Sequence, residues 1–480
     1  METYVSVYLG STFLALVTTP IVIRLARKIN AIDLPGVRTV HVRPTPRIGG
    51  VALYLSTIPL IVTVLFLDNN IGQAFRNARM QLIALFGSAT FIFLIGLVDD
   101  LRGLPVRFKF LAELLAAGSL CLVGVHISSI SITEQWTLRL GLFSYPLTLL
   151  WIIGVTNAVN LSDGLDGLAA GISAITCGVI VVFALQSGNV IMSVFILALL
   201  GSLTSFLFFN FNPAKIFLGD CGSLFLGYTI ASSSILCSMK SSALVGLALP
   251  VLALGIPIFD TFFSMLRRFL ERRSMFSPDR SHFHHKLIDL GLRQRHVVLL
   301  IYIMTILAAG LGMFMMVTRD AGSLIVFFCI LLLLLLAFQM VGSVRLREIV
   351  FSLQKKYEIA NQRKQEKKNF EQAQLYFRNA RTFKQWWNAI CEAARRMDFV
   401  WVSLKTKELD GTIRTEIWRA ADSNTDQSQI VVMTVPVNGS GLERLYEFEI
   451  AISIDGSYES AGYRATLFNR LIDEHVIVYS

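Results

Sequence analysis

The sequence predicts an all-α polytopic membrane protein with about eleven transmembrane helices, followed by a C-terminal cytoplasmic α+β domain. Three observations predict this fold class. Hydrophobic residues make up 54% of the 480 residues, charged residues only 16%, and the mean hydropathy is +0.61, which is too apolar for an ordinary soluble domain. Apolar segments of membrane-spanning length recur along the first 342 residues. The chain beyond residue 345 is instead rich in charged residues.

Each predicted span is an apolar run of about 17 to 23 residues with few charges. The first run lacks a small-residue cleavage site and its basic residues follow the apolar stretch, so we expect a retained helix rather than a signal peptide. The eleven predicted spans cover residues 4–23, 49–67, 81–98, 108–126, 142–158, 166–186, 189–209, 222–238, 242–264, 297–317 and 322–342.

The distribution of Lys and Arg over the connecting loops predicts the orientation. The odd-numbered loops carry 18 of these residues and the even-numbered loops carry 5. The positive-inside rule therefore places the odd loops and the tail in the cytoplasm, and the N-terminus outside. The net charge of +10 is expected to face anionic lipid headgroups or substrate phosphates, and no nucleic-acid partner is predicted. The odd loops are 24–48, 99–109, 159–165, 210–221 and 265–296.

The chain after the membrane domain (1–344) is predicted to contain two further regions. Residues 345–379 are charged and nearly free of Gly and Pro, which indicates a juxtamembrane helix. Residues 380–480 contain strand-like segments such as "DFVWVSLKT" and "YEFEIAISI" and end in a helical pattern, which predicts a small cytoplasmic α+β domain. This domain contains no catalytic motif, so a regulatory or partner-binding role is the default interpretation.

Acidic residues stand out in the predicted cytoplasmic loops. Asp99 and Asp100 directly follow a span, and adjacent carboxylates suit Mg²⁺, which takes oxygen ligands and shares them with substrate phosphates. A solvated helix end is the alternative. Asp220, in "LGDCGS", would either complete an oxygen shell or cap the next helix. Asp260, within the ninth span, is interpreted as structural, paired with Arg267–Arg268.

The stretch "NAVNLSDGLDG" places four polar residues between two apolar segments. Asn157, Asn160, Asp163 and Asp166 recur every third residue, so a helical conformation would align them on one face. A carboxylate at the membrane boundary is costly and is by default a sign of function. The alternative is an Asp-rich turn with capping residues.

A histidine group follows "SPDR" in the last odd loop. His282, His284 and His285 form an H-x-H-H pattern in a basic loop with Arg280, where imidazoles would bind phosphate oxygens or exchange protons near neutral pH. A zinc site is disfavoured because the six cysteines show no metal-ligand grouping near it. A solvated loop is the remaining alternative.

Together with "HVRPTPRIGG" in the first loop, these motifs resemble the polyprenyl-phosphate N-acetylhexosamine-1-phosphate transferases of glycosyltransferase family 4, over roughly residues 10–340. The resemblance implies transfer of an N-acetylhexosamine 1-phosphate from a UDP-sugar to undecaprenyl or another polyprenyl phosphate. UMP would be released, and lipid-linked cell-surface glycan synthesis would begin. The histidine loop is similar to that of the UDP-GlcNAc branch and lacks the three consecutive histidines of the phospho-MurNAc-pentapeptide branch. GlcNAc 1-phosphate is therefore the expected group.

The resemblance also implies roles for the motif residues, with Mg²⁺ as the cofactor and Mn²⁺ as the alternative. Either Asp99 or Asp100 is the candidate general base or positions the lipid phosphate. The expected catalytic residues are Asp99, Asp100, Asp163 and Asp166, and the expected metal ligands are Asp220 and Asp100. The expected substrate-binding residues are Arg43, Arg47, Lys109, Asn157, Asn160, Arg280, His282, His284 and His285. The sequence leaves open which of the two arginines contacts phosphate, and whether transfer is direct or passes through an aspartyl intermediate.

The implied location is the inner (plasma) membrane of a bacterial cell, with the active site and the C-terminus in the cytoplasm. A homodimer, and binding of a regulator or a downstream glycosyltransferase to the C-terminal domain, are left open. Two other functions compete. An ion-coupled transporter predicts acidic residues at mid-membrane and an inverted repeat, whereas these carboxylates lie at helix ends. A non-catalytic scaffold would tolerate loss of the acidic motif residues, yet all are present.

Overall fold

The computed structural model of the chain divides into two compact units, Met1–Leu346 and Arg347–Ser480. Each unit is described by itself. The residues that the structure describes are 2–35, 44–131, 137–238, 250–270, 282–318, 321–342, 346–407, 412–420, 430–437, 446–454 and 458–475.

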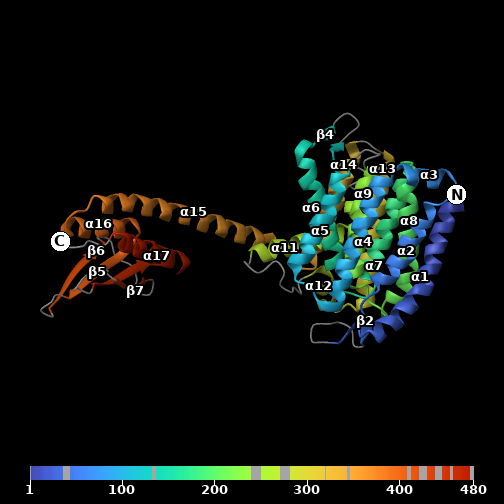
Figure 1. The fold of residues 1–480 in the computed structure, drawn as a ribbon. Helices are drawn as coiled ribbons and strands as arrows, with labels where there is room; N and C mark the ends of the chain where they lie inside the picture. Colours follow the sequence, from blue (N-terminus) through green and yellow to red (C-terminus); the bar gives the residue numbers. More distant parts are fainter. Residues whose placement is uncertain are drawn as a thin grey trace. The chain divides into compact units, whose positions relative to one another are not determined.

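The first unit is a bundle of helices with two small antiparallel strand pairs, β1 with β2 and β3 with β4 (Figure 1). Its strands are β1 (Ile32–Asp33), β2 (Thr45–Pro46), β3 (Ser129–Ser131) and β4 (Thr137–Arg139). Its helices are α1 (Glu2–Lys28), α2 (Gly50–Val64), α3 (Asn70–Asn77), α4 (Arg79–Arg102), α5 (Val106–Leu122), the short 3₁₀ helix η1 (Gly141–Phe143), α6 (Ser144–Leu161), α7 (Leu168–Gln186), α8 (Val190–Asn210), α9 (Gly219–Ser238), α11 (Gly255–Leu270), α12 (Phe283–Asp289), α13 (Gln294–Thr318) and α14 (Ala321–Met340).

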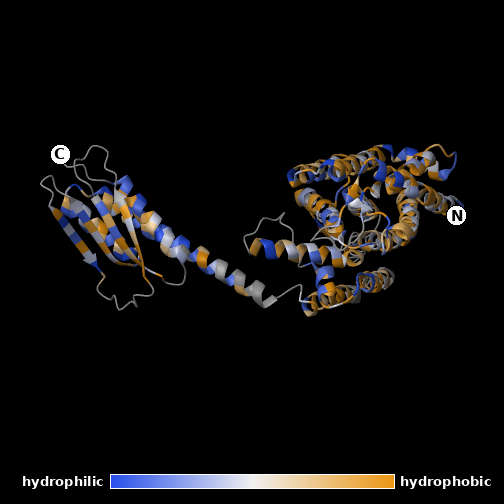
Figure 2. Ribbon diagram, turned by 90° about the horizontal axis from the view of Figure 1, so that it is seen from below, coloured by the Kyte–Doolittle hydropathy of each residue, from blue (hydrophilic) through white to orange (hydrophobic). Residues whose placement is uncertain are grey.

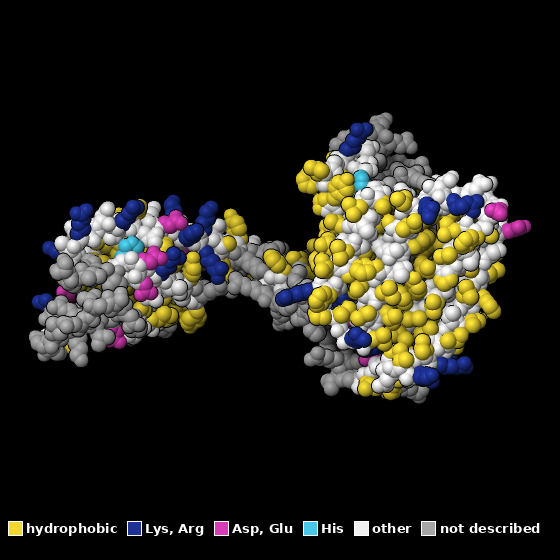
Figure 3. All heavy atoms as spheres, in the orientation of Figure 1, with side chains coloured by type: hydrophobic (Ala, Val, Ile, Leu, Met, Phe, Trp, Pro, Cys, Tyr) yellow, Lys and Arg dark blue, Asp and Glu magenta, His cyan; other side chains and the backbone are white. Residues whose placement is uncertain are grey.

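The lengths and surface of these helices identify a polytopic membrane protein. Seven helical segments among the described residues are long and apolar enough to cross a membrane: α1, α4, η1 with α6, α7, α8, α9 and α13. Helix α2 and the Ile325–Met340 part of α14 are apolar but shorter. Large apolar side chains point outward, as at Phe13 (65% exposed) and Leu115 (58%), and Figure 3 shows them across the side of this unit, with most Lys and Arg near its two ends.

Seven of the eleven predicted spans contain a described helix that is long and apolar enough to cross a membrane, and four do not. The second, fourth and ninth predicted segments contain α2, α5 and α11, helices of only 15, 17 and 16 residues, and the described apolar part of α14 in the eleventh is also shorter. Residues 242–249 of the ninth segment lie outside the described part of the chain. In addition, the second loop contains a helix that was not predicted, α3, whose N-cap Asn69 accepts a hydrogen bond from the Gly72 N–H at 2.9 Å. Such capping satisfies a donor that the first turn leaves free.

Helix α9 is the centre of the bundle. Every residue from Cys221 to Ser238 is buried, and the helix packs against α4, α6, α7 and α2. Small residues permit this close approach. A Cβ at Gly96 of α4 would lie 2.6 Å from the backbone oxygen of Asp220, and a Cβ at Gly227 would lie 2.6 Å from the Cα of Thr156 on α6. The start of α9, where Asp220 lies, is therefore held tightly between its neighbours.

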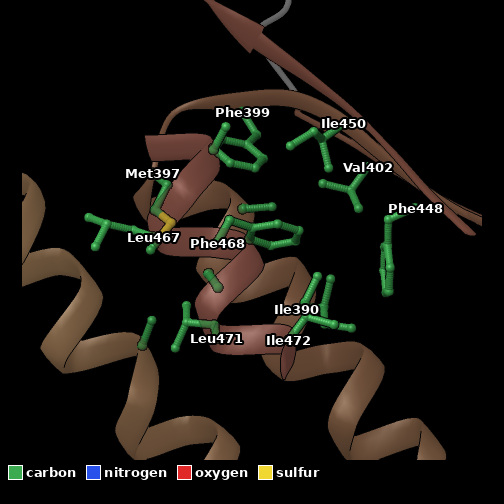
Figure 4. Close-up of a cluster of buried hydrophobic side chains, with 14 of the residues drawn as sticks. Ile390, Met397, Phe399, Val402, Phe448, Ile450, Leu467, Phe468, Leu471 and Ile472 are labelled. Atoms are coloured by element: carbon green, nitrogen blue, oxygen red, sulfur yellow. The ribbon is translucent and has the colours of Figure 1, made fainter. Parts of the chain in front are cut away.

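The second unit is built on a four-stranded antiparallel sheet of order β6-β5-β8-β7. Hydrophilic and hydrophobic residues alternate along these strands (Figure 2), as expected when one face of a sheet is packed. Figure 4 shows the buried side chains, including Phe399, Phe448 and Phe468, which pack between sheet and helices. The elements are α15 (Leu346–Arg378), α16 (Phe383–Arg396), β5 (Phe399–Lys407), β6 (Ile413–Arg419), β7 (Ile430–Val437), β8 (Tyr446–Ser453) and α17 (Tyr458–Glu474).

Candidate active site

Residues from all five predicted polar loops line one cavity of about 410 Å³ in the first unit. Strand β2 and helix α12, which border it, lie at one end of the bundle, and α3 and β4 lie at the other (Figure 1). The alternation of spans thus places the unusual polar residues on one side, as the sequence predicted. The lining residues are Asp33, Arg47, Asp100, Asp163, Gly164, Leu165, Asp166, Asn210, Phe217, Gly219, Asp220, His285 and Gln294.

Arg47 is held at the cavity by pairing between the first and fourth loops. The Phe217 N–H donates to the Pro46 carbonyl at 2.7 Å, and the Gly49 N–H donates to the Phe217 carbonyl at 2.9 Å. Within the described residues, the Nε of Arg47 is buried and has no hydrogen-bond partner. An unpaired buried guanidinium nitrogen is costly unless an anion binds it. Arg43, the alternative phosphate ligand, lies outside the described residues, as does Arg280.

Asp100 caps the helix that carries Asp220. Its two carboxylate oxygens accept the backbone N–H groups of Asp220 and Cys221, each at 2.9 Å, so a negative charge lies at the N-terminus of α9. Gly219 makes this contact possible, because its φ is +73° and a Cβ there would lie 2.7 Å from Asp100 Oδ2. The structure therefore gives Asp100 a capping role that the sequence interpretation did not foresee.

Lys109 connects two of the predicted acidic residues. Its ammonium lies 2.9 Å from Asp99 Oδ2 and 2.8 Å from Asp220 Oδ2, although the two aspartates are 121 positions apart in the chain. The other Asp99 oxygen accepts the Leu104 N–H. Lys109, predicted to bind substrate phosphate, thus neutralises two carboxylates at the edge of the cavity and fixes their separation.

The polar stripe predicted from "NAVNLSDGLDG" is not one continuous helix. Helix α6 ends at Leu161 and α7 begins at Leu168, with a turn between them. Asn157 and Asn160 therefore lie on α6, and Asn157 donates to Glu113 of α5 rather than lining the cavity. The alignment on one face was wrong because the turn changes the direction of the chain after Leu161.

The two aspartates of this turn have different surroundings. Asp166 accepts the Asn212 side-chain amide at 2.9 Å and the Ala214 N–H at 3.1 Å, so it anchors the fourth loop. Asp163 is half-buried at the cavity wall, and its carboxylate makes no hydrogen bond with any described residue. Burial raises the pKa of Asp163 to about 8, and the nearby carboxylates of Asp220, Asp100 and Asp166 add to the rise. The cavity therefore has excess negative charge that a bound cation would relieve.

The histidine group is anchored by Asp260 of α11. The Asp260 carboxylate pairs with His282 Nδ1 at 3.0 Å and accepts the Phe283 N–H at 2.8 Å, so the structure pairs it with the histidine loop. His282 and His284 are buried, and burial lowers the pKa of His284 to about 3, although Asp260 acts in the opposite direction. Of the three predicted phosphate-binding histidines, only His285 lines the cavity.

The donor set can accommodate a divalent cation together with substrate oxygens. Among the described residues, no group of three or more His, Cys, Asp or Glu side chains lies close enough to form a complete metal site. Mg²⁺ commonly takes only one or two protein carboxylates and completes its shell with phosphates and water. Asp163 and Asp220, which line the same cavity, meet that requirement.

Several cavity and support residues were not predicted. Glu113, only 2% exposed, accepts from Asn157; a charged residue inside an apolar segment was the available signal for it. Asp33, Asn210, Phe217 and Gln294 line the cavity, but ordinary polar or aromatic residues near helix ends give no comparable signal in a single sequence.

Comparison with known proteins identifies the family of this chain. A profile of glycosyl transferase family 4 matches residues 82–238, which include Asp99, Asp100, Lys109, the Asp163–Asp166 turn and Asp220. A probable undecaprenyl-phosphate N-acetylglucosaminyl 1-phosphate transferase of Bacillus subtilis is 42% identical over 299 residues, covering 62% of this chain and 80% of the relative.

Two further relatives have related names. A decaprenyl-phosphate N-acetylglucosaminephosphotransferase of Mycobacterium leprae is 36% identical over 305 residues, or 58% of this chain and 75% of the relative. An undecaprenyl-phosphate alpha-N-acetylglucosaminyl 1-phosphate transferase of Yersinia pestis is 27% identical over 325 residues, or 66% and 85%. With the profile match and a 42% identical relative aligned over most of its length, the chain belongs to glycosyl transferase family 4.

Proposed function

We propose that this protein transfers GlcNAc 1-phosphate from UDP-GlcNAc to polyprenyl phosphate, releasing UMP and forming a polyprenyl-diphospho-GlcNAc. The names of the relatives from three bacteria support both the transferred group and the lipid acceptor. The protein would lie in the plasma membrane of a bacterial cell. The excess of Lys and Arg in the odd loops supports an orientation in which the cavity opens to the cytoplasm. A nucleotide sugar could reach the cavity from that side while the polyprenyl tail stays in lipid.

The observation that carries this proposal is the charge arrangement around one cavity. Five carboxylates line it, from Asp33, Asp100, Asp163, Asp166 and Asp220, while Arg47 supplies an Nε that has no hydrogen-bond partner among the described residues. Transfer between two phosphates brings several negative charges together, and its catalysis consists mainly of positioning and charge stabilisation. A site with anchored carboxylates for a cation, and an arginine for an anion, suits that chemistry.

We propose that Asp220 and Asp163 hold the divalent cation, with Mg²⁺ the expected ion and Mn²⁺ an alternative. When bound, the metal would draw the phosphate oxygens together and reduce their mutual repulsion. Asp100 supports this arrangement indirectly, because its bonds to the N-terminus of α9 fix the backbone of Asp220. Lys109 holds the Asp220 carboxylate from the other side.

The bond changes follow from the products. An oxygen of the lipid phosphate attacks the β-phosphorus of UDP-GlcNAc, and the bond from that phosphorus to the oxygen bridging the α-phosphate breaks. The bridging oxygen leaves as part of UMP. A phosphate monoester has a second pKa of about 6, so the acceptor is largely a dianion at neutral pH and requires no strong base. Asp99 and Asp100 can therefore serve by holding Lys109 and α9 rather than by removing a proton.

The test is UMP release by the purified full-length protein in detergent, with undecaprenyl phosphate, Mg²⁺ and UDP-GlcNAc. We expect UMP only when lipid and Mg²⁺ are both present, and little with Asp220→Asn. UDP-GalNAc in place of UDP-GlcNAc tests the sugar. UMP production that is unaffected by EDTA would contradict the metal role. No UMP release with any UDP-sugar would contradict the proposed function.

The direct route has a separate test. Enzyme incubated with donor carrying ³²P in the β-phosphate, but without lipid acceptor, is expected to remain unlabelled after denaturation. A stable label on the protein that is lost in Asp163→Asn or Asp99→Asn would replace the direct route with a two-step route through an aspartyl phosphate.

A further inference from the structure

A chain of three side chains crosses from the Asp163–Asp166 turn to the start of α13. Asn212 donates its side-chain amide to Asp166 Oδ2 at 2.9 Å, and the same nitrogen lies 3.1 Å from Gln294 Oε1. Gln294, the first residue of α13, is half-buried and lines the cavity. This hydrogen-bonded series therefore connects Asp166 of the predicted motif to Gln294, a neutral polar residue that none of the sequence motifs identified.

The donors and acceptors in this hydrogen-bonded series determine the orientation of the Asn212 and Gln294 carboxamide groups. The Ala214 backbone N–H, which can only donate, also reaches Asp166 Oδ2 at 3.1 Å, so that oxygen is an acceptor. The Asn212 atom that faces it must then be the NH₂ group, because an amide oxygen cannot donate. The same NH₂ group meets Gln294, so the facing Gln294 atom must be its oxygen.

The consequence is a fixed hydrogen-bond donor at the cavity. With its Oε1 accepting from Asn212, Gln294 presents Nε2, which carries two N–H donors and no acceptor capacity. Among the described residues, none accepts from this nitrogen, and a donor left unpaired in a half-buried site is unfavourable. Nε2 is neutral and therefore suits a neutral carbonyl oxygen. The charged phosphates are better matched by the guanidinium of Arg47, which lines the same cavity.

We propose that Gln294 determines donor specificity by hydrogen bonding to a carbonyl oxygen of the nucleotide sugar. This inference rests on the proposed function for the identity of that donor. Two carbonyls distinguish UDP-GlcNAc from close analogues: the acetamido oxygen, which UDP-glucose lacks, and the uracil C4 oxygen, which an amino group replaces in cytidine nucleotides. Sites that hydrogen-bond a ligand discriminate against analogues without the matching group, because their own polar atom is left unpaired.

The experiment measures equilibrium affinities of the full-length protein in detergent with Mg²⁺ and without lipid acceptor, so that it does not depend on turnover. UDP-GlcNAc is compared with UDP-glucose, and UMP with CMP. Gln294→Met removes both the donor and the acceptor at nearly constant volume. Gln294→Glu keeps an oxygen for Asn212 but replaces the donor with an acceptor. Gln73→Met, on the exposed surface of α3, is the matched control.

The result is read from the ratio of affinities within each ligand pair, because misfolding or added charge weakens binding of both ligands in the pair. We expect one ratio to fall by roughly 3- to 10-fold in Gln294→Met, the size of one lost neutral hydrogen bond, with Gln73→Met unchanged. A fall in the UDP-GlcNAc to UDP-glucose ratio identifies the acetamido oxygen. A fall in the UMP to CMP ratio, larger in Gln294→Glu, identifies uracil.

Two outcomes would overturn the proposal. If both ratios stay at the wild-type value in both variants, Gln294 only joins α13 to the fourth loop. If the wild-type protein binds none of the four ligands, the inference and the proposed function both fail. Wild-type protein that binds with normal selectivity but releases no UMP with lipid would contradict only the proposed function.

Discussion

Lys109 Nζ lies 2.8 Å from Asp220 Oδ2, joining the start of α5 to the start of α9. The same ammonium lies 2.9 Å from Asp99, so one cation holds two carboxylates that the sequence separates widely. Asp220 also lines the cavity and is the proposed metal ligand. If it holds the cation, lysine and metal share one carboxylate, and a change in one is expected to alter binding of the other.

Removing the Lys109 charge is predicted to separate activity from metal binding. Lys109→Met leaves two carboxylates without their cation, so Mg²⁺ should bind more tightly while the geometry for transfer is lost. We expect kcat to fall on the order of 100-fold while the Mg²⁺ concentration for half-maximal activity decreases. Metal titrations of residual activity measure both effects. An unchanged Mg²⁺ requirement would show that Lys109 and the metal do not share Asp220.

Mg²⁺ affinity is predicted to depend on pH through Asp163. With a pKa of about 8 in the metal-free site, this carboxyl holds a proton at neutral pH, and a cation must displace it. Apparent Mg²⁺ affinity should therefore rise as pH increases from 6.5 to 8, by up to about tenfold per unit, and level off above 8. Calorimetric titration at several pH values measures this. Asp163→Asn should flatten the dependence; an equally steep dependence in that variant would assign the proton to another group.

Asp260 is predicted to position His285 without touching substrate. Asp260→Ala removes the acceptor for both His282 and the Phe283 N–H, so the start of α12 loses its anchor. A displacement of about 1 Å can cost 100-fold in rate, and we expect kcat/KM to fall roughly 10- to 100-fold. Asp260→Asn keeps one oxygen for Phe283, and His282 can change tautomer to accept from the new amide. That variant should retain most activity; equal losses in both would mean that the negative charge itself matters.

Asp100 is predicted to act on stability as well as on activity. In Asp100→Asn one of the two oxygens that accept from Asp220 and Cys221 becomes an NH₂ group facing an N–H donor. Loss of a charged cap costs about 1–2 kcal/mol, so the Tm in detergent should fall by about 2–4 °C. Asp68→Asn, an exposed aspartate before α3, is the control. A normal Tm with complete loss of activity would return Asp100 to the role of base or metal ligand.

The sequence predicted the parts of this site that depend on hydrophobic length and on charge. Apolar runs located most of the helices that form the bundle, and the alternation of their loops brought Arg47, Asp100, Asp163, Asp220 and His285 to one cavity. These features follow from the membrane itself, because each span must be apolar and each crossing reverses the side.

The remaining features depend on tertiary packing, which a single sequence does not display. The cap of α9 by Asp100 requires that α4 approach within contact of Gly219. Asp260, a residue interpreted from sequence only through its arginine neighbours, contacts His282 and His284, while His285 lines the cavity. The break in the polar stripe follows from the turn after Leu161. Each of these was missed because spacing along the chain does not show which partner a side chain meets.

The most direct test of the account follows the β-phosphate of the donor. Full-length protein in detergent is given undecaprenyl phosphate, Mg²⁺ and UDP-GlcNAc labelled with ³²P in the β-phosphate, and the label is separated between lipid and water. Sugar 1-phosphate transfer predicts that the label enters the lipid with the sugar and that unlabelled UMP is the released nucleotide. The Asp220→Asn variant should form neither the labelled lipid nor UMP. Label that remains on released UDP while the sugar enters the lipid would show transfer of the sugar alone and contradict the central claim.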